Sequence, residues 1–217
     1  MTTFRVALTF DAEHPDRQAA FGNHDRLLDA LAAADIPATF FVQGRWAEAY
    51  PLTARRIARD GHLVGSHSHY HARLPLLSAV GLAEDIRDAE KAILEHVGVD
   101  PKPWFRCPFG SGADDPELVG RIEALGYREV GWHFSSDDWE PTRSAAVVAD
   151  TVVLEAIKHG DGAVILQHTW PDQTLAAIRD IGSRLRDAGA TFVRIDQLDI
   201  DRLPSALTDA ATAESAT

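Results

Sequence analysis

The segment HSHYH at residues 67–71 carries the clearest chemical signal in this sequence, because its first and last histidines stand four positions apart. If the segment turns like a helix, His67 and His71 lie on one face, where both imidazoles can reach one metal ion at about 2.0–2.1 Å. By the same spacing His69 points elsewhere and is not expected to bind. An isolated pair with this spacing is more often structural. Three crowded histidines, with a carboxylate-bearing strand end elsewhere, favour a metal site.

Acidic, basic and imidazole side chains also follow four other apolar runs. They are Asp11 and Glu13 after RVALTF, Arg106 after WF, Asp137 and Asp138 after REVGWHF, and His168 after AVILQ. Carboxylates and histidines can bind a divalent ion and transfer protons, which are the two requirements of metal-assisted hydrolysis. This chemistry requires all five segments to meet in the folded chain.

The elements between these segments alternate in type. Strand-like runs cover residues 5–10, 38–44, 62–67, 104–108, 128–134, 163–168 and 191–195, and helix-like stretches cover 25–36, 53–61, 82–98, 116–126, 147–160 and 181–189. Strict alternation predicts a parallel sheet with helices outside it, and seven units without a glycine-rich dinucleotide loop favour a distorted (β/α)7 TIM-like barrel. The carboxyl ends of the strands in such a barrel meet on one face, where the polar residues would converge.

The composition is that of one globular domain, which we place at residues 1–200, followed by a polar tail at 201–217 that we expect to be flexible. The net charge of −12 argues against nucleic acid as a partner, because such complexes depend on Lys and Arg. The single cysteine, Cys107, excludes an internal disulfide. With no long apolar run and no signal-peptide pattern, we expect no membrane contact and a cytoplasmic location, or secretion if the sequence is a trimmed form. The sequence does not indicate an oligomeric state.

Five segments, in this order and each at an expected strand end, resemble the motifs of the polysaccharide deacetylase family, the NodB-like carbohydrate esterases of family 4. They are TFDAEH at residues 9–14, HSHYH at 67–71, RCPFG at 106–110, DDW at 137–139 and LQH at 166–168. The resemblance spans residues 5 to about 197 and implies a barrel hydrolase that removes acetyl groups with one divalent metal ion. Zinc is the default, and histidine with carboxylate ligation also suits cobalt, nickel or manganese.

The resemblance assigns roles to four charged residues. Asp11 matches the general base, and Arg106 matches the arginine that keeps this carboxylate ionised and oriented. His168 matches the general acid that protonates the leaving amine. Asp138 matches the carboxylate that pairs with this histidine and raises its pKa, with Asp137 as the alternative partner.

The first motif departs from the family pattern, which usually reads TFDDG with the second Asp as a metal ligand. Ala12 stands at that position and cannot bind metal. In an extended chain residues 11 and 13 point to the same side, so Glu13 can reach an ion that residue 12 cannot. The predicted metal ligands are therefore Glu13, His67 and His71. His14 is the rival ligand, although it would face away in an extended segment. In a second alternative, Asp11 binds the metal and another carboxylate is the base.

Three further residues match positions that the family uses around the substrate. The backbone N–H of Phe109 would help to bind the oxyanion. Leu166 and Trp139 match residues that line the pocket for the acetyl methyl group. The family also has an Asp three residues before its Asp-Trp pair, where this chain has Ser135, so local hydrogen bonding is expected to differ.

Three functions compete at this point. The first is removal of an N-acetyl group from an amino sugar, in a chitin-like or peptidoglycan-like chain or a small conjugate. The second keeps the same site but acts on a small amide, a cyclic imide or an acetyl ester such as acetylxylan. The third is a catalytically silent binding module. The proposed base, acid and both histidines are all retained, which favours an enzyme and ranks the silent module last.

Overall fold

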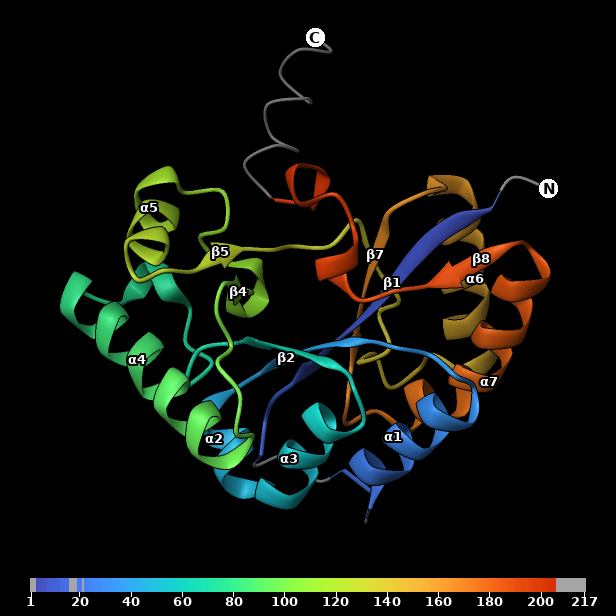
Figure 1. Cartoon of the computed structure of the whole chain (residues 1–217), viewed down its shortest axis with the longest axis horizontal. Helices are drawn as coiled ribbons and strands as arrows, with labels where there is room; N and C mark the ends of the chain where they lie inside the picture. The colour runs from blue at the N-terminus through green and yellow to red at the C-terminus, as the bar shows by residue number, and fades with distance from the viewer. Residues whose placement is uncertain (1–2, 16–18, 21, 206–217) are drawn as a thin grey trace, which may run out of the picture.

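A computed structural model describes residues 3–15, 19–20 and 22–205 of the chain. The strands pair in parallel and curl into an incomplete barrel, with the helices on the outside (Figure 1). The strand order is β5-β4-β3-β2-β1-β7-β6, and β8 pairs with β1. This architecture confirms the predicted distorted (β/α)7 barrel.

The elements of the described chain have the following bounds. The strands are β1 (Phe4–Ala12), β2 (Thr39–Val42), β3 (Leu63–Ser66), β4 (Trp104–Phe105), β5 (Arg128–Glu129), β6 (Phe134–Ser135), β7 (Ala163–His168) and β8 (Ala190–Phe192). The α-helices are α1 (Asn23–Ala33), α2 (Gly44–Ala49), α3 (Pro51–Arg59), α4 (Ala79–His96), α5 (Pro116–Ala124), α6 (Ala145–His159) and α7 (Asp172–Asp187). Short 3-10 turns are η1 (Leu74–Leu76), η2 (Pro108–Gly110), η3 (Ile195–Gln197) and η4 (Ile200–Arg202).

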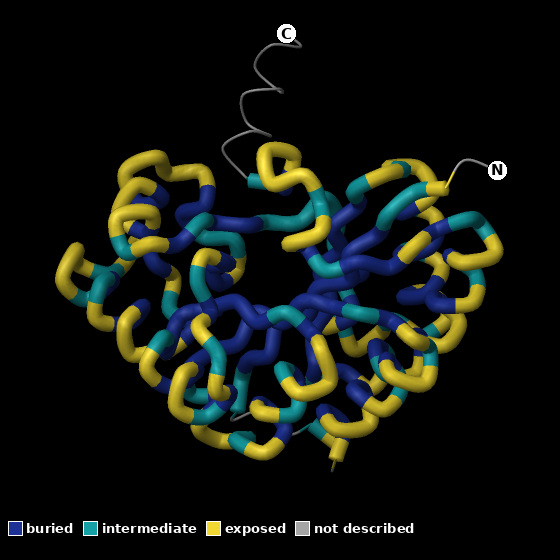
Figure 2. The backbone as a smooth tube through the Cα atoms, viewed as in Figure 1, coloured by how far each residue is buried: buried dark blue, intermediate teal, exposed yellow. Residues whose placement is uncertain are grey.

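The strand β1 lies inside the sheet and pairs with three other strands. It pairs with β7 on one edge, while β8 and then β2 pair with the other edge. Val6, Leu8 and Phe10 belong to the large apolar cluster between sheet and helices, whereas Ala7 belongs to a smaller inner cluster. Because side chains alternate across a strand, Asp11 lies on the same inner side as Ala7. Figure 2 shows the buried strands inside and the exposed outer sides of the helices.

The strand expected at residues 128–134 is divided into β5 and β6, which is a correction to the sequence prediction. Arg106 explains the interruption. Its guanidinium donates to the carbonyl oxygens of Val130 at 3.1 Å and Gly131 at 2.8 Å, and the N–H of Gly131 donates to Pro204 at 2.8 Å, so these groups bond outside the strand ladder. A residue that serves the site therefore divides the strand.

Two helices also differ from the prediction. The helix expected from residue 181 begins at Asp172, directly after Pro171, and its first turns bury Thr174 and Ala177. These small or polar residues give only a weak apolar period. The helix α2 was not expected, because six residues are too few for a periodic signal, although it buries Trp46 completely.

The packed chain continues past the expected boundary at residue 200. Leu203 is 6% exposed in the inner cluster, and the carbonyl oxygen of Pro204 accepts the N–H of Gly131 at 2.8 Å. The rest of the predicted tail, 206–217, lies outside the described residues. No helix in the described part of the chain is long and apolar enough to cross a membrane.

Candidate active site

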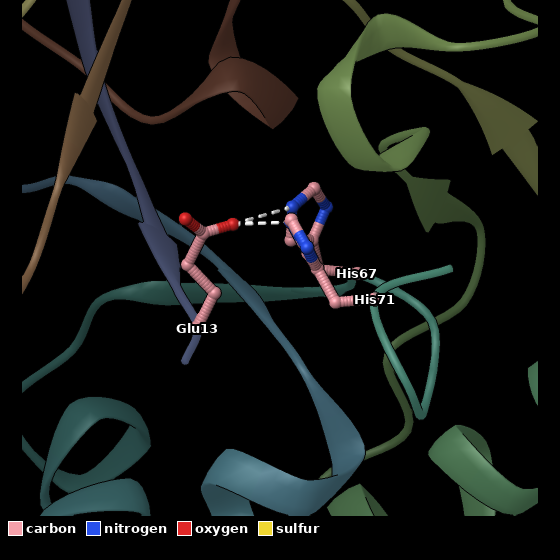
Figure 3. A group of neighbouring side chains, drawn as sticks. All are labelled: Glu13, His67 and His71. Carbon is pink, nitrogen blue, oxygen red and sulfur yellow. Dashed lines mark hydrogen bonds and ion pairs between the residues drawn. The ribbon is translucent and has the colours of Figure 1, made fainter. Parts of the chain in front are cut away.

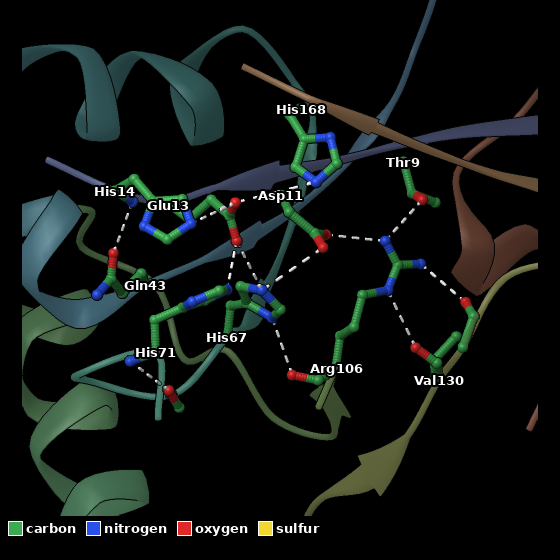
Figure 4. Close-up of polar contacts among 12 residues, drawn as sticks. Thr9, Asp11, Glu13, His14, Gln43, His67, His71, Arg106, Val130 and His168 are labelled. Atoms are coloured by element: carbon green, nitrogen blue, oxygen red, sulfur yellow. Dashed lines mark hydrogen bonds and ion pairs between the residues drawn. The ribbon is translucent and has the colours of Figure 1, made fainter. Parts of the chain in front are cut away.

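Asp11 lies at the end of β1 and is only 4% exposed. Arg106, which directly follows β4, donates from Nη1 to Asp11 Oδ1 at 2.9 Å and to Thr9 Oγ1 at 2.9 Å (Figure 4). The other carboxylate oxygen of Asp11 lies 3.5 Å from His67 Nε2. A buried carboxylate needs a charged partner, and the fully buried Arg106 supplies it. One oxygen of the predicted base is thus fixed while the other faces the histidines.

Glu13 meets both histidines of HSHYH (Figure 3). Its Oε2 lies 3.3 Å from His67 Nε2 and in direct contact with His71 Nε2. One candidate ligand atom from each of these three buried residues lies within 4.8 Å of the others. The three predicted metal ligands are therefore brought together, and the extended course of β1 explains why Glu13 rather than Ala12 reaches the histidines.

The hydrogen bonds around the two imidazoles fit a divalent cation. His67 Nδ1 donates to the carbonyl oxygen of Arg106 at 2.9 Å, and in the neutral ring this leaves a lone pair on Nε2. Both ring nitrogens of His71 are buried, and apart from the contact of Nε2 with Glu13 Oε2 they have no hydrogen-bond partner among the described residues. Buried polar atoms usually have a partner, and an ion between Glu13 and the two rings would supply one.

The electrostatics of the three residues also favour a positive charge between them. Burial would raise the pKa of the Glu13 carboxyl, but contacts with His14, His67 and His71 outweigh burial and hold this pKa well below its usual range. Burial opposes protonation of His67, yet the facing Asp11 and Glu13 carboxylates raise its pKa. A site that attracts a proton in this way also attracts a metal ion.

A second group of candidate ligands consists of Asp11, Glu13 and His168, whose atoms also lie within 4.8 Å of one another. This group corresponds to the alternative in which Asp11 binds the metal. Burial lowers the pKa of His168, but Asp138 and the nearby Glu13 and Asp11 outweigh burial and raise it to about 9. The first group offers two imidazoles and one carboxylate, a ligand set that zinc uses, whereas the second offers one imidazole and two carboxylates, so the chemistry of the donors favours Glu13 with His67 and His71.

His14 lies within the site, contrary to the expectation that it would face away. Its φ of 55° ends the extended course of the chain, and its backbone N–H donates to Gln43 Oε1 at 3.0 Å. The imidazole then turns back, with Nε2 3.0 Å from Glu13 Oε1. His14 thus contacts the carboxylate oxygen that does not face His67 and His71, which favours an orienting contact over ligation.

The segment that carries the two histidines is not the helical turn that the sequence suggested. Ser68 and His71 both have positive φ, at 61° and 58°, and Ser68 Oγ accepts the N–H of His71 at 3.0 Å. Asp85, in α4, accepts the backbone N–H groups of His69 at 3.1 Å and Tyr70 at 2.9 Å. The loop therefore owes its shape to a buried carboxylate on another element.

His168, the last residue of β7, pairs with Asp138. Its Nδ1 lies 2.7 Å from Asp138 Oδ1, and its backbone N–H donates to Oδ2 at 2.7 Å. This double contact directs Nε2 toward the site, 3.9 Å from Glu13 Oε1. The alternative partner, Asp137, instead pairs with Arg143 at 2.9 Å. The proposed acid is thus protonated at neutral pH and faces the candidate metal ligands.

A pocket of about 430 Å³ opens over these groups. It is lined by Asp11, Glu13, His14, His71, Phe109, Trp132, Ser135, Asp137, Trp139, Leu166, His168 and Trp170. The three predicted substrate-contact residues, Phe109, Trp139 and Leu166, are all among them. Ser135, which replaces the family Asp, accepts the N–H of Asp137 at 3.0 Å. A lining that combines polar groups with aromatic side chains suits a carbohydrate carrying a small acyl group.

Sequence reasoning missed two residues near the site, Asp85 and Glu129. Asp85 acts through backbone groups, for which the sequence offers no pattern. Glu129 lies inside an apolar run and is 5% exposed. A carboxylate within an expected strand was the signal that could have marked it as a candidate site residue. Trp132, which lines the pocket, is one of several aromatic residues near strand ends that the sequence offers for stacking on a sugar.

The chain belongs to the polysaccharide deacetylase family, since the family model described as Polysaccharide deacetylase matches residues 1–130. The Listeria monocytogenes protein Peptidoglycan-N-acetylglucosamine deacetylase PgdA is 32% identical over 202 residues. The match covers 93% of this chain but only 40% of that relative.

Solved structures have the same fold as this chain. A structure described as a T48 deacetylase with substrate has a TM-score of 0.79 at 32% identity and covers 94% of this chain and 95% of that one. Wild-type BA3943 from Bacillus anthracis, described as a CE4 family pseudoenzyme, has a TM-score of 0.78 at 25% identity and covers 90% and 65%. Because this fold also occurs without activity, catalysis has to be argued from the side chains.

Proposed function

We propose that this protein is a metal-dependent deacetylase that removes the N-acetyl group from an amino sugar in a peptidoglycan-like or chitin-like chain. The observation that carries the proposal is that Glu13, His67 and His71 come together as one group of candidate ligands. Asp11 contacts this group at His67, and His168, whose pKa is raised, faces it at Glu13. Family membership and the similarity to a peptidoglycan N-acetylglucosamine deacetylase support the carbohydrate substrate.

Each residue of the site has a separate role in the proposed reaction. Glu13, His67 and His71 would hold a divalent ion, zinc by default, which when bound polarises the acyl oxygen and acidifies water. Asp11 Oδ2 faces this group, and it accepts the proton of the attacking water. Arg106 keeps Asp11 in place through the other oxygen.

The leaving nitrogen needs a proton, and His168 donates it. Asp138 holds the ring through Nδ1, so that the proton on Nε2 faces the pocket. The half-exposed Phe109 stands at the pocket wall, where its backbone N–H would stabilise the negative oxygen that forms during attack. Leu166 and Trp139 would exclude water around the acetyl methyl group.

The test is acetate release from N-acetylglucosamine oligomers by purified protein, before and after treatment with a chelator and then with Zn²⁺, Co²⁺, Ni²⁺ or Mn²⁺. We expect activity to be lost with the chelator and restored by a divalent ion. Activity that is insensitive to metal removal would contradict the proposal.

Asp11→Asn is the matched variant, since it keeps the size of the side chain but removes the base. It should bind metal as the unchanged protein does and lose turnover by about 10²–10⁴-fold. Parallel assays with acetylxylan and small amides check the substrate class. If only an ester is hydrolysed, the N-deacetylase assignment fails while the metal site stands.

A further inference from the structure

A second pocket, which we term the Glu129 pocket, adjoins the active-site pocket. It has a volume of about 280 Å³ and shares two aromatic residues, Phe109 and Trp132, with the active-site pocket. Its other described lining residues are Gly110, Ala113, Glu129, Gly131 and Ser205. A space of this size accommodates one small group of a larger ligand better than a whole ligand.

Glu129 is the ionisable residue among those that line this pocket. It is 5% exposed, and its Oε2 is buried without a hydrogen-bond partner among the described residues. Buried carboxyl groups are normally paired, because an unpaired one loses its hydration without compensation. An unpartnered carboxyl at the wall of a pocket therefore points to a ligand that supplies the partner.

The nearest cation does not supply it. Arg106 acts on Glu129 through its charge, but its donors are directed to Thr9, Asp11, Val130 and Gly131. Burial raises the pKa of the Glu129 carboxyl to about 7, although Arg106 opposes this shift. A cationic group in the pocket would hold Glu129 in its charged form.

Glycines keep the Glu129 pocket open beside Trp132. Gly110 has a φ of 64°, and a Cβ added there would lie 3.2 Å from Trp132 Cη2. Phe109, at the shared wall, is 52% exposed and offers an aromatic surface on which a sugar ring can lie. Because the two pockets share Phe109 and Trp132, the Glu129 pocket is the place where the next unit of a sugar chain would lie.

We propose that the Glu129 pocket binds the protonated amine of a sugar adjacent to the one being deacetylated, so that the enzyme prefers chains already carrying a free amino group. The inference rests on the proposed function, because the amine is what the same reaction leaves on a neighbouring sugar. It names the substrate class more closely as a partly deacetylated amino-sugar chain.

The test compares kcat/KM for a fully acetylated N-acetylglucosamine disaccharide with kcat/KM for the two disaccharides that carry one free amine. A hydrogen bond between charged groups predicts that one of the amine-bearing disaccharides is preferred by about 10- to 150-fold. Glu129→Gln keeps the size of the side chain but removes the charge, so this preference should fall to about 1. No preference in the unchanged protein, or a preference that Glu129→Gln leaves intact, overturns the proposal.

Two further variants keep the test decisive. Asp114→Asn removes an exposed carboxylate close in sequence to the pocket residue Ala113, and it should leave the preference intact. Ser205→Phe places a bulky side chain at the wall of the pocket without removing the Glu129 charge, and it should abolish the preference even if Glu129→Gln fails to fold. If Glu129→Gln weakens hydrolysis of all three disaccharides equally, the pocket binds a hydroxyl and the amine proposal is wrong.

Direct binding separates this inference from the proposed function. A fully deacetylated glucosamine disaccharide should bind the unchanged protein about 10-fold or more tightly than it binds Glu129→Gln, measured by calorimetry. This result would stand even if no substrate released acetate, in which case the deacetylase proposal fails alone. Equal affinities would reject the amine pocket while leaving the deacetylase proposal untouched.

Discussion

The histidines at the two ends of the curled sheet are used in opposite ways. At the carboxyl ends of the strands, His67 and His168 face carboxylates, and these carboxylates raise the pKa of both imidazoles. Toward the amino ends, His62 Nδ1 accepts the N–H of Ala38 at 3.2 Å and His133 Nδ1 accepts the N–H of Val164 at 2.9 Å. Burial lowers the pKa of each of these two histidines to about 4.

His168 thus holds a positive charge at the carboxyl end, although burial lowers the pKa of its neighbour His71, whereas His62 and His133 are neutral rings at the amino end. The difference lies in the neighbours, since Asp11, Glu13 and Asp138 surround the first group, whereas backbone N–H groups meet the second. A histidine near a strand end is therefore no sign of a metal site by itself. The carboxylates define the active end, and substitutions at either end should have distinct consequences.

The largest effect is expected from Glu13→Ala. Glu13 is the carboxylate shared by both groups of candidate ligands, so its loss leaves His67 and His71 as an incomplete site. Removing outer partners of metal ligands typically costs 10- to 100-fold in affinity, and removing a ligand should exceed about 100-fold. Zinc stoichiometry and affinity, measured by calorimetry on the dialysed protein, check this.

The control for Glu13→Ala is His62→Gln at the amino end, which should bind zinc like the unchanged protein. If Glu13→Ala keeps full zinc affinity while His14→Ala loses it, then His14 is the third metal ligand. The ligands at the carboxyl end would in that case be His14, His67 and His71.

Asp138→Asn comes next, and it should affect turnover rather than metal binding. An amide at position 138 no longer raises the pKa of His168 and fixes its Nδ1 less well, so the proton donor is weakened. We expect kcat to fall by about 10²–10⁴-fold with zinc affinity retained. Asp137→Asn is the matched control, because Asp137 pairs with Arg143 instead. Equal losses in both variants would contradict the assignment of Asp138.

The residues that sequence patterns could predict are those whose placement follows from strand geometry. Asp11 and Glu13 share a side because a strand alternates, and the ends of β3, β4 and β7 place His67, Arg106 and His168 at the same edge. The expected architecture was confirmed for the same reason, since the apolar runs mark the strands directly.

The residues that sequence patterns missed depend on contacts distant in sequence. The turn at His14 depends on Gln43, which accepts its N–H, and the loop after His67 depends on Asp85. Positive φ values at Ser68 and His71 replace the helical turn that HxxxH spacing suggests. The division of β5 from β6 coincides with the hydrogen bonds that Arg106 donates to Val130 and Gly131. The strand propensity of residues 128–134 gives no sign of these bonds.

Asp85→Asn should give a smaller loss at the carboxyl end. An amide keeps one acceptor oxygen but turns an N–H group toward the backbone N–H of His69 or Tyr70, so the loop shifts. We expect zinc to bind about 10- to 100-fold more weakly, as for other partners of metal ligands. The visible spectrum of the cobalt-loaded protein should also change, because it reports ligand geometry.

Asp88→Asn, an exposed substitution on the same helix, is the control for Asp85→Asn and should leave affinity and spectrum unchanged. An unchanged spectrum in Asp85→Asn with lowered thermal stability would assign Asp85 to stability alone.

The smallest effect belongs to the amino end and concerns stability against pH. Burial, with Arg56 and Arg194 nearby, holds the pKa of His62 at about 4 although Asp60 opposes the shift, whereas its ordinary value is 6.5. As pH falls below 6.5 the unfolded chain takes up a proton that the folded chain refuses until about pH 4, so stability decreases over this interval. At pH 5.5 this corresponds to about 1.4 kcal/mol for one such group.

His62→Gln removes this titration while keeping an acceptor for the N–H of Ala38. The difference in unfolding free energy between the two proteins, from urea titrations, should be constant above pH 7 and should shift in favour of the variant by about 1.4 kcal/mol at pH 5.5. At the carboxyl end the pH dependence of stability should have the opposite direction. The raised pKa of His168 stabilises the folded state below pH 6.5, and this contribution is lost as pH rises toward 9. A pH-independent difference for His62→Gln would show that His62 is not held neutral, and the contrast between the two ends would then rest on geometry alone.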